Sequence, residues 1–256
     1  MQRKLLFLFA LCLSLAAHLY ASIPSGYYTS ASGKQGAALK TALASIITSG
    51  HTAQSYAGVW TAYQTTDLRS DGKIWDRYSS ITNYTYGYQG GQGNACGNYT
   101  AEGSCYNREH SFPDSWGAPD GDIVHVIPTD GYVNNRRGNY PFGENNGDTY
   151  TSMNGYSKLG ACTVSGYTGP CFEPNDEIKG DIARIYFYMA TCYENQISTW
   201  SSNAEASHVF NGTKYPAFTQ WQLDMLMRWS KQDPVDAVET ARNIEVYKHQ
   251  SNRKPF

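Results

Sequence analysis

Long apolar segments are nearly absent from this 256-residue sequence, and beyond residue 21 none is apolar enough to cross a membrane. The one apolar run, from Leu5 to Ala17, follows the basic pair Arg3 and Lys4 and is too short to span a bilayer comfortably. Ala21 then supplies a small residue for cleavage. This layout is typical of a secretory signal peptide. We therefore expect residues 1–21 to be removed near Ala21 and the protein to be secreted or periplasmic.

Charge is also scarce. Charged residues make up 16% of the chain, with 20 Lys and Arg against 22 Asp and Glu, for a formal net charge of -2. Loss of Arg3 and Lys4 with the leader lowers the net charge to about -4. Nucleic-acid-binding proteins are usually basic, so any phosphate-binding surface here must be a local patch. No repeat or linker divides the remainder, which predicts one domain over residues 22–256. A monomer is the default expectation, since the sequence does not establish the oligomeric state.

The cysteines also lack the spacing typical of zinc ligands, because no C-x-x-C pair occurs. This disfavours a structural zinc site, although zinc stays an alternative. An exported protein meets oxidising conditions, in which disulfides persist. Cys96–Cys105 and Cys162–Cys171 each enclose eight residues in Gly-rich loops, and we expect them to form two local disulfides. Cys192 would then remain as a free thiol in a helix, and other pairings stay open.

Hydrophobic periodicity places most of the regular structure in helices. Apolar residues spaced three and four apart, or all around the helix, predict helices over residues 33–50, 56–63, 177–195, 218–230 and 235–250. The segment 177–195 is apolar on nearly every side, which indicates a buried helix.

Shorter elements are expected between these helices. Residues 73–78 (KIWDRY) and 123–127 (IVHVI) are candidate strands, the second ended by Pro128, and residues 132–137 predict a short helix. Residues 83–104 and 138–172 are rich in Gly, Asn and Tyr and predict loops. The expected fold class is therefore α+β: a mainly helical single domain with a small antiparallel sheet and long Gly- and Tyr-rich loops.

Three adjacent ionisable residues stand out in the stretch CYNREHSFPDSW, which places Arg108, Glu109 and His110 just before a Phe-Pro turn. Three adjacent ionisable side chains are not expected in a buried strand. On a surface strand they could be exposed without a function, whereas an active site could use all three groups. The stretch VNNRRGN, which begins at Val133, follows the next expected strand and opens a helix. A strand ending in Glu-His, a second strand, and a helix with Asn and Arg make a compact layout for a metal site.

This layout has the groups that phosphodiester hydrolysis needs: a base for water, a divalent ion, and donors that hold the phosphate. His110 can be the base, since a histidine ordinarily titrates near neutrality. Glu109 can supply a hard oxygen ligand, and the Asn134 amide can supply a second without added charge. Few protein ligands and several waters are what Mg²⁺ prefers.

Five blocks of the sequence, in order, resemble the endonuclease I family of exported ββα-metal (His-metal finger) nucleases. The blocks are NREHSFP (107–113), D-x-x-H-V-I-P-T-D-G (122–131), VNNRRGNYPFGE (133–144), FEPNDEIKGDIARIYFYMA (172–190) and RNIEVYKHQSNRKPF (242–256). The resemblance runs from about residue 36 to Phe256. It implies a ββα-metal motif and a metal-dependent, sequence-nonspecific endonuclease that cleaves DNA, often also RNA, to 5′-phosphate ends. Contact with the substrate would be through its phosphate backbone.

Carried over by position, the resemblance implies that His110 is the general base. Glu109 and Asn134 would bind the ion, for which we expect Mg²⁺ with Mn²⁺ or Ca²⁺ as alternatives. Some relatives use an arginine in the loop between the two strands, but residues 111–121 contain none here. The phosphate contact must then pass to Arg108, Arg136 or Arg137, and we expect Arg108 and Arg137 to act in catalysis.

Less specific interpretations exist for the same residues. His110 could be an exposed strand histidine, Glu109 a salt-bridge partner of Arg108, and Asn134 only a helix N-cap. His125, in an apolar segment, is expected to be structural. For the whole protein, the abundant Tyr and Trp could indicate a non-enzymatic glycan-binding module, and a hydrolase of another phosphodiester is a further alternative.

Overall fold

The computed structural model describes residues 23–81, 83–88, 91 and 93–256, so the expected signal peptide lies outside the described residues. The elements are η1 (Thr29–Ala31), α1 (Gly36–Thr48), α2 (Gly58–Thr66), β1 (Tyr106–His110), η2 (Asp114–Trp116), β2 (Val126–Asp130), α3 (Gly131–Arg137), β3 (Tyr150–Thr151), η3 (Met153–Gly155), β4 (Lys158–Ala161), β5 (Pro170–Glu173), α4 (Asp176–Cys192), η4 (Glu194–Gln196), α5 (Ile197–Trp200), η5 (Ala206–His208), α6 (Gln220–Gln232) and α7 (Ala237–Gln250). The fold is α+β, and the long helices predicted from periodicity are confirmed.

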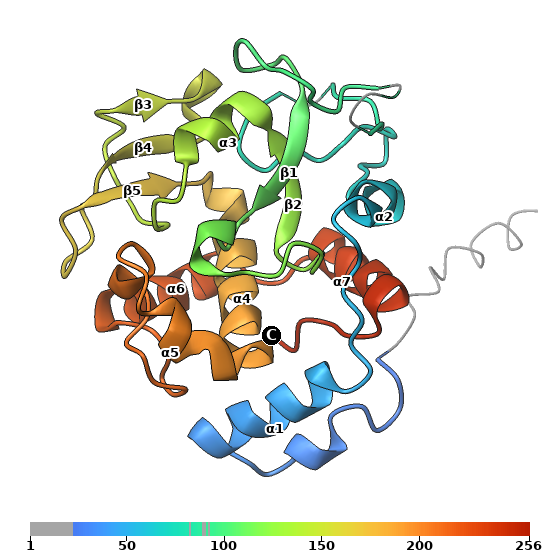
Figure 1. Cartoon of the computed structure of the whole chain (residues 1–256), viewed down its shortest axis with the longest axis vertical. Helices are drawn as coiled ribbons and strands as arrows, with labels where there is room; N and C mark the ends of the chain where they lie inside the picture. The colour runs from blue at the N-terminus through green and yellow to red at the C-terminus, as the bar shows by residue number, and fades with distance from the viewer. Residues whose placement is uncertain (1–22, 82, 89–90, 92) are drawn as a thin grey trace, which may run out of the picture.

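Helix α4 forms the centre of the molecule (Figure 1). Almost all of its residues are buried, as its nearly continuous apolar surface predicted, and it packs against α1 and α6. Asn175 caps its start by accepting a hydrogen bond from the Glu177 N–H. In Figure 1 the antiparallel β1–β2 pair and α3 lie together on one side of α4, with the three-stranded sheet β3–β4–β5 beside α3.

The exit of β1 is anchored in the core by an aromatic cluster. Phe112, two residues after the strand, is fully buried. Its ring centroid lies 4.5 Å from that of Trp200, 5.4 Å from that of Phe210 and 5.5 Å from that of Tyr186. Such aromatic contacts add to the burial of apolar area. They hold the end of β1, and therefore His110, in a fixed place.

The strand expected over residues 123–127 begins later, and this prediction was wrong in its bounds. Strand β2 starts at Val126 and continues through Pro128 to Asp130. Asp122 is the reason, because its Oδ1 atom accepts a hydrogen bond from the Val124 N–H and its carbonyl accepts one from His125, which makes a turn. Pro128 is tolerated because a two-stranded pair has outer edges where a missing N–H costs nothing.

Two other expectations were also wrong. Residues 73–78 form only isolated bridges, because the Asp76 carboxylate accepts hydrogen bonds from the Tyr78 and Ser79 N–H groups and turns the chain. Residues 138–172 were expected to be loop, but they contain β3, β4 and β5. These strands have two to four residues, too few for an alternating pattern to be visible in the sequence.

The cysteines follow the prediction in part. Cys96 and Cys105 form a disulfide, and Cys192 is a free, buried thiol at the end of α4. Cys162 and Cys171 are also free, so the second predicted disulfide is not formed. In the β4–β5 register Cys171 pairs with Gly160, which leaves Cys162 on the diagonal. Diagonal Cα atoms typically lie about 7–8 Å apart, more than in most disulfides. The two thiols are nevertheless in hydrogen-bond contact, which lowers the pKa of Cys162 to about 7.

A buried ion-pair cluster joins α2 to α7. The Asp67 Oδ1 atom lies 2.7 Å from Arg77 Nη2 and 2.9 Å from Arg242 Nε, and all three side chains are buried. Burial alone would raise the pKa of Asp67, but the two guanidinium groups outweigh it and hold the pKa below its ordinary value. Arg242 also donates to the Ile123 carbonyl oxygen at 2.6 Å, so the cluster fixes the turn that leads into β2.

We predict that Arg242→Ala lowers the free energy of unfolding by about 3–5 kcal/mol, because it leaves a buried carboxylate short of a partner. Lys248→Ala is the control, since its ion pair with Glu245 lies at the surface and contributes little. Urea unfolding of both variants measures the difference. Equal stabilities for the two variants would contradict the importance of the cluster.

A second prediction concerns stability at low pH. His125 is fully buried, and burial lowers its pKa to about 4 even though Asp122 and Asp120 act to raise it; His110 also lowers it. The unfolded chain binds the proton near pH 6.5, so between these values the unfolded state holds more protons and stability falls as pH falls. The resulting decrease in the free energy of unfolding reaches about 3 kcal/mol near pH 4.

Thermal unfolding of wild type and His125→Gln between pH 7 and 4.5 tests this prediction. Other carboxylates titrate in both proteins, so the difference between the two curves is the quantity to read. We expect the Tm of the wild type to fall more steeply on acidification. Parallel curves would show that protonation of His125 does not lower the stability of the folded protein.

Candidate active site

β1, β2 and α3 follow one another closely and form one compact unit. Asp130 joins the last two, because it ends β2 and caps α3 with its Oδ1 atom, which accepts hydrogen bonds from the Tyr132 and Val133 N–H groups. Its Oδ2 atom accepts from the Tyr84 hydroxyl and the Gly103 N–H. The N-cap is therefore Asp130, and Asn134 lies inside the helix with its side chain available for another role.

Asn107 and Glu109 lie on the face of β1 that is turned toward α3. They are two residues apart in a strand and so share a face, and Asn134 and Arg137 are three apart on a helix and do the same. Asn134 contacts Asn107 and Arg137 contacts Glu109. The two predicted metal ligands, Glu109 and Asn134, therefore lie on facing surfaces of β1 and α3.

The Glu109 carboxylate is buried and held from one side. Its Oε1 atom accepts hydrogen bonds from the Tyr78 hydroxyl at 2.8 Å and from Arg137 Nη1 at 2.9 Å. Within the described part of the chain, Oε2 receives no hydrogen bond. Because hydrogen-bond donors around a ligating carboxylate fix its orientation, this arrangement leaves Oε2 positioned for a cation.

The Asn134 amide is oriented in the same way. Its Nδ2 atom donates to Asn107 Oδ1 at 2.8 Å, and no described residue donates a hydrogen bond to its amide oxygen. A carboxylate and an amide oxygen are hard donors of the kind that Mg²⁺ takes, with water completing its octahedron. The donor set on β1 and α3 thus fits a magnesium-type ion.

His110 ends β1, and its side chain leaves the strand on the face opposite to Glu109. Its ring centroid lies 5.6 Å from those of Tyr56 and His125, and its Nε2 atom lies 3.6 Å from Asp120 Oδ1. Burial lowers the pKa of His110, although Glu109 and Asp120 act to raise it. The imidazole is therefore neutral at neutral pH and able to accept a proton.

The Nε2 atom of His110 is buried and has no hydrogen-bond partner among the described residues. A buried nitrogen without a partner is uncommon and costs free energy. Because Glu109 is close enough to affect the titration of His110, the two side chains border the same end of β1 from its two faces. This end is where a base and a metal ligand could act on one substrate.

The two predicted catalytic arginines occupy different environments. Arg108 is partly exposed, and its guanidinium lies over the rings of Tyr56 at 3.3 Å and Trp60 at 4.6 Å, on the same face of β1 as His110. Arg137 was expected to face phosphate, but it is buried. It donates to Glu109 and to the carbonyl oxygens of His110 and Ser111. Its position suits support of Glu109 rather than contact with a substrate.

Three contributors were not predicted from the sequence. Tyr78 holds Glu109, Asn107 holds Asn134, and Asp120 lies beside His110. Asn107 could have been found from strand alternation, since it precedes Glu109 by two residues. Tyr78 and Asp120 come from loops, and no local pattern points to them. His125 is structural as expected, with its Nε2 atom 2.8 Å from the Pro119 carbonyl oxygen.

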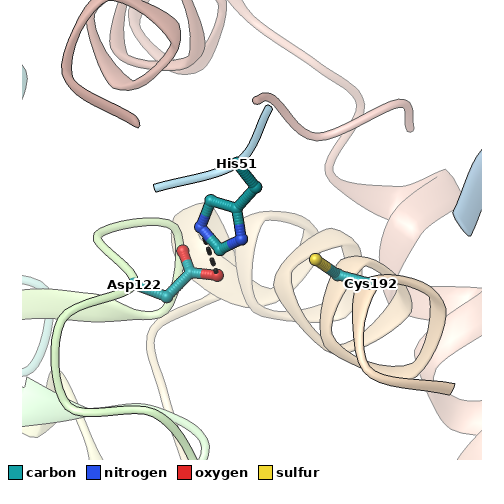
Figure 2. A group of neighbouring side chains, drawn as sticks. All are labelled: His51, Asp122 and Cys192. Carbon is teal, nitrogen blue, oxygen red and sulfur yellow. Dashed lines mark ion pairs between the residues drawn. The ribbon is translucent and has the colours of Figure 1, made fainter. Parts of the chain in front are cut away.

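A second group of side chains that could bind a metal ion consists of His51, Asp122 and Cys192 (Figure 2). Asp122 Oδ1 accepts from the Val124 N–H and Gln250, and its Oδ2 accepts from the Tyr188 and Tyr193 hydroxyls. A carboxylate has about four lone-pair sites, and these bonds fill them. The group is therefore better explained as a buried polar junction between α4, α7 and the turn before β2.

Several known proteins that are similar to this chain are named as nucleases. The family model of endonuclease I matches residues 35–256. An extracellular ribonuclease of Bacillus amyloliquefaciens is 36% identical over 90% of this chain and 74% of the relative, and one of Bacillus subtilis (strain 168) is 34% identical with the same coverage. An extracellular deoxyribonuclease of Aeromonas hydrophila is 27% identical over 56% of this chain and 52% of the relative.

No helix in the described part of the chain combines the length and apolarity needed to cross a bilayer. The matched region includes β1, β2, α3 and every candidate site residue discussed above. The chain belongs to the endonuclease I family.

Proposed function

We propose that this protein is a secreted or periplasmic, metal-dependent endonuclease that hydrolyses DNA and RNA to 5′-phosphate ends with little sequence preference. Family membership and the names of the relatives support a nuclease outside the cytoplasm. One observation carries the metal-dependent mechanism. Glu109 on β1 and Asn134 on α3 lie on surfaces that face each other, next to the neutral imidazole of His110.

RNA is proposed as a full substrate beside DNA. The relatives that match 90% of this chain are named ribonucleases, whereas those named deoxyribonucleases match about half of it. A nuclease that contacts phosphate and sugar rather than base edges has no direct means to read sequence. Cleavage of both polymers at many positions follows from such contacts.

The mechanism divides the work between the two faces of β1. Glu109 and Asn134 would hold the divalent ion, which supplies charge stabilisation at the phosphate and the departing oxygen. Tyr78 and Arg137 keep the Glu109 carboxylate in place, and Asn107 keeps the Asn134 oxygen turned outward. His110 takes the proton of the attacking water at a ring nitrogen. Arg108, held over Tyr56, would contact the phosphate.

Mg²⁺ is the proposed ion, with Mn²⁺ or Ca²⁺ as alternatives. The two ligands are hard oxygen donors with a single formal negative charge between them. A site with so few protein ligands leaves several positions to water and to phosphate oxygens, as Mg²⁺ prefers.

A glycan-binding module is less well supported. Such modules stack sugars on exposed aromatic rings, but most tryptophans here are buried: Trp60, Trp116, Trp200, Trp221 and Trp229. A hydrolase of another phosphodiester would use the same site. Parallel assays with plasmid, RNA and bis(p-nitrophenyl) phosphate separate it from a nuclease.

We predict that His110→Ala lowers the rate of plasmid and RNA cleavage about 10²- to 10⁴-fold, because the water loses its base. His208→Ala, at an exposed histidine far along the chain, is the control and should cleave like the wild type. Circular dichroism should give matching spectra for all three proteins. Wild-type cleavage rates in His110→Ala would refute the proposed role of this residue.

We predict that EDTA abolishes cleavage and that added Mg²⁺ or Mn²⁺ restores it. Mutation of a residue that only supports a metal ligand typically costs about 10- to 100-fold in metal affinity or activity. Asn134→Ala removes one of two ligands, so the metal concentration for half-maximal activity should rise about tenfold or more. Asn195→Ala, which changes an exposed asparagine, is the control and should leave this metal concentration unchanged. Full activity in EDTA, or an unchanged metal requirement in Asn134→Ala, would argue against this site.

A further inference from the structure

Arg136 is exposed on the outer side of α3 and is held in position by aromatic rings. Its guanidinium carbon lies 4.8 Å from the ring centroid of Tyr132 and 5.7 Å from that of Tyr150, and its Nη2 atom donates to the Tyr132 hydroxyl. It makes no ion pair with a carboxylate in the part of the chain that the structure describes. A fixed arginine without a counter-ion is suited to bind an anion.

A cavity of about 370 Å³ opens beside this arginine, between the end of α3 and the β3–β4 strands. We define the α3 surface by six of its lining residues: Asn135, Arg136, Asn139, Tyr140, Tyr150 and Glu205. One cation, two amides and two phenol rings match the phosphate, base edges and base faces of a nucleic acid strand. Glu205 is the single carboxylate among these six and is exposed.

A cavity between α4 and α6 lacks this character. It has a volume of about 410 Å³ and contains Lys179 and Arg228. Lys179 pairs with Asp176 at 2.6 Å, and Arg228 pairs with Glu144 at 2.6 Å. Because carboxylates already neutralise both cations, this cavity is a weaker site for phosphate than the α3 surface.

The α3 surface adjoins the candidate active site. Arg137, the next residue, reaches back to Glu109 and to the His110 carbonyl oxygen. Arg136 is two residues after Asn134, so it lies about 3 Å along the helix axis and about 200° around it, on the opposite side of α3. A strand with its scissile phosphate at the end of β1 would meet Arg136 where the flanking nucleotides pass around α3.

We propose that the α3 surface is a secondary binding site for the nucleic acid strand, with a flanking phosphate on Arg136 and a base against Tyr140 or Tyr150. This inference rests on the proposed nuclease function and adds to it a residue that determines substrate affinity. A small phosphodiester reaches only the end of β1, whereas a polymer also covers the α3 surface. The α3 surface thus favours polymers over small diesters.

Binding of a fluorescein-labelled 12-nucleotide single strand, as DNA and as RNA, tests the proposal in EDTA by fluorescence anisotropy. Arg136→Ala should raise the Kd about three- to tenfold. It should also reduce the slope of log Kd against log salt concentration by about one, the amount expected for the loss of one phosphate contact. Arg136→Lys keeps the charge but loses the planar group, so its Kd should be intermediate. Lys231→Ala, which removes an exposed charge from α6, is the matched control and should bind like the wild type.

Kinetics supply the second readout. Arg136→Ala should raise KM for plasmid and RNA by a similar factor and leave kcat and the hydrolysis of bis(p-nitrophenyl) phosphate unchanged. Equal Kd and KM values for Arg136→Ala and Lys231→Ala would overturn the proposal. Failure of the wild type to cleave any phosphodiester would instead refute the proposed function, and the binding assay would still decide whether the α3 surface binds nucleic acid.

Discussion

The buried ion pair between Arg137 and Glu109 is the interaction on which the candidate site depends. It ties the last residue of α3 to β1, and the same guanidinium holds the carbonyl oxygens of His110 and Ser111, where β1 ends. A buried charge without its partner is costly, so neither residue can be lost without strong destabilisation. The pair also explains why an arginine of the VNNRRGN stretch points inward while its neighbour, Arg136, remains free to meet a substrate.

This arrangement gives the two faces of β1 different tasks. One face, with Glu109, is packed on α3 and carries oxygen donors that are oriented by Tyr78, Asn107 and Arg137. The other face carries His110 in a partly buried position where the neutral imidazole is favoured. In the proposed mechanism these groups are oriented before a substrate binds, which is the condition for efficient electrostatic catalysis.

Local patterns in the sequence predicted the long helices, the short helix over residues 132–137 and the Cys96–Cys105 disulfide. The helix around Ile182 was predictable because its apolar residues recur at helical spacing. Glu109, His110 and Asn134 were singled out because three ionisable residues stand together before a Phe-Pro turn and because five sequence blocks resemble the endonuclease I family. The start of β2 was missed because the Asp122 carboxylate turns the chain, which is a side-chain effect. Tyr78 was missed because its contact with Glu109 spans 31 residues, and such pairings have no local signature.

The central claim is that one divalent ion binds between β1 and α3. Crystals grown with Mn²⁺ and measured at its absorption edge test it most directly. The account predicts an anomalous peak about 2.0–2.2 Å from an oxygen of Glu109 and from the amide oxygen of Asn134, since Mn²⁺ binds hard oxygen donors at nearly the distances of Mg²⁺. A peak at His51, Asp122 and Cys192 with none between β1 and α3 would contradict it.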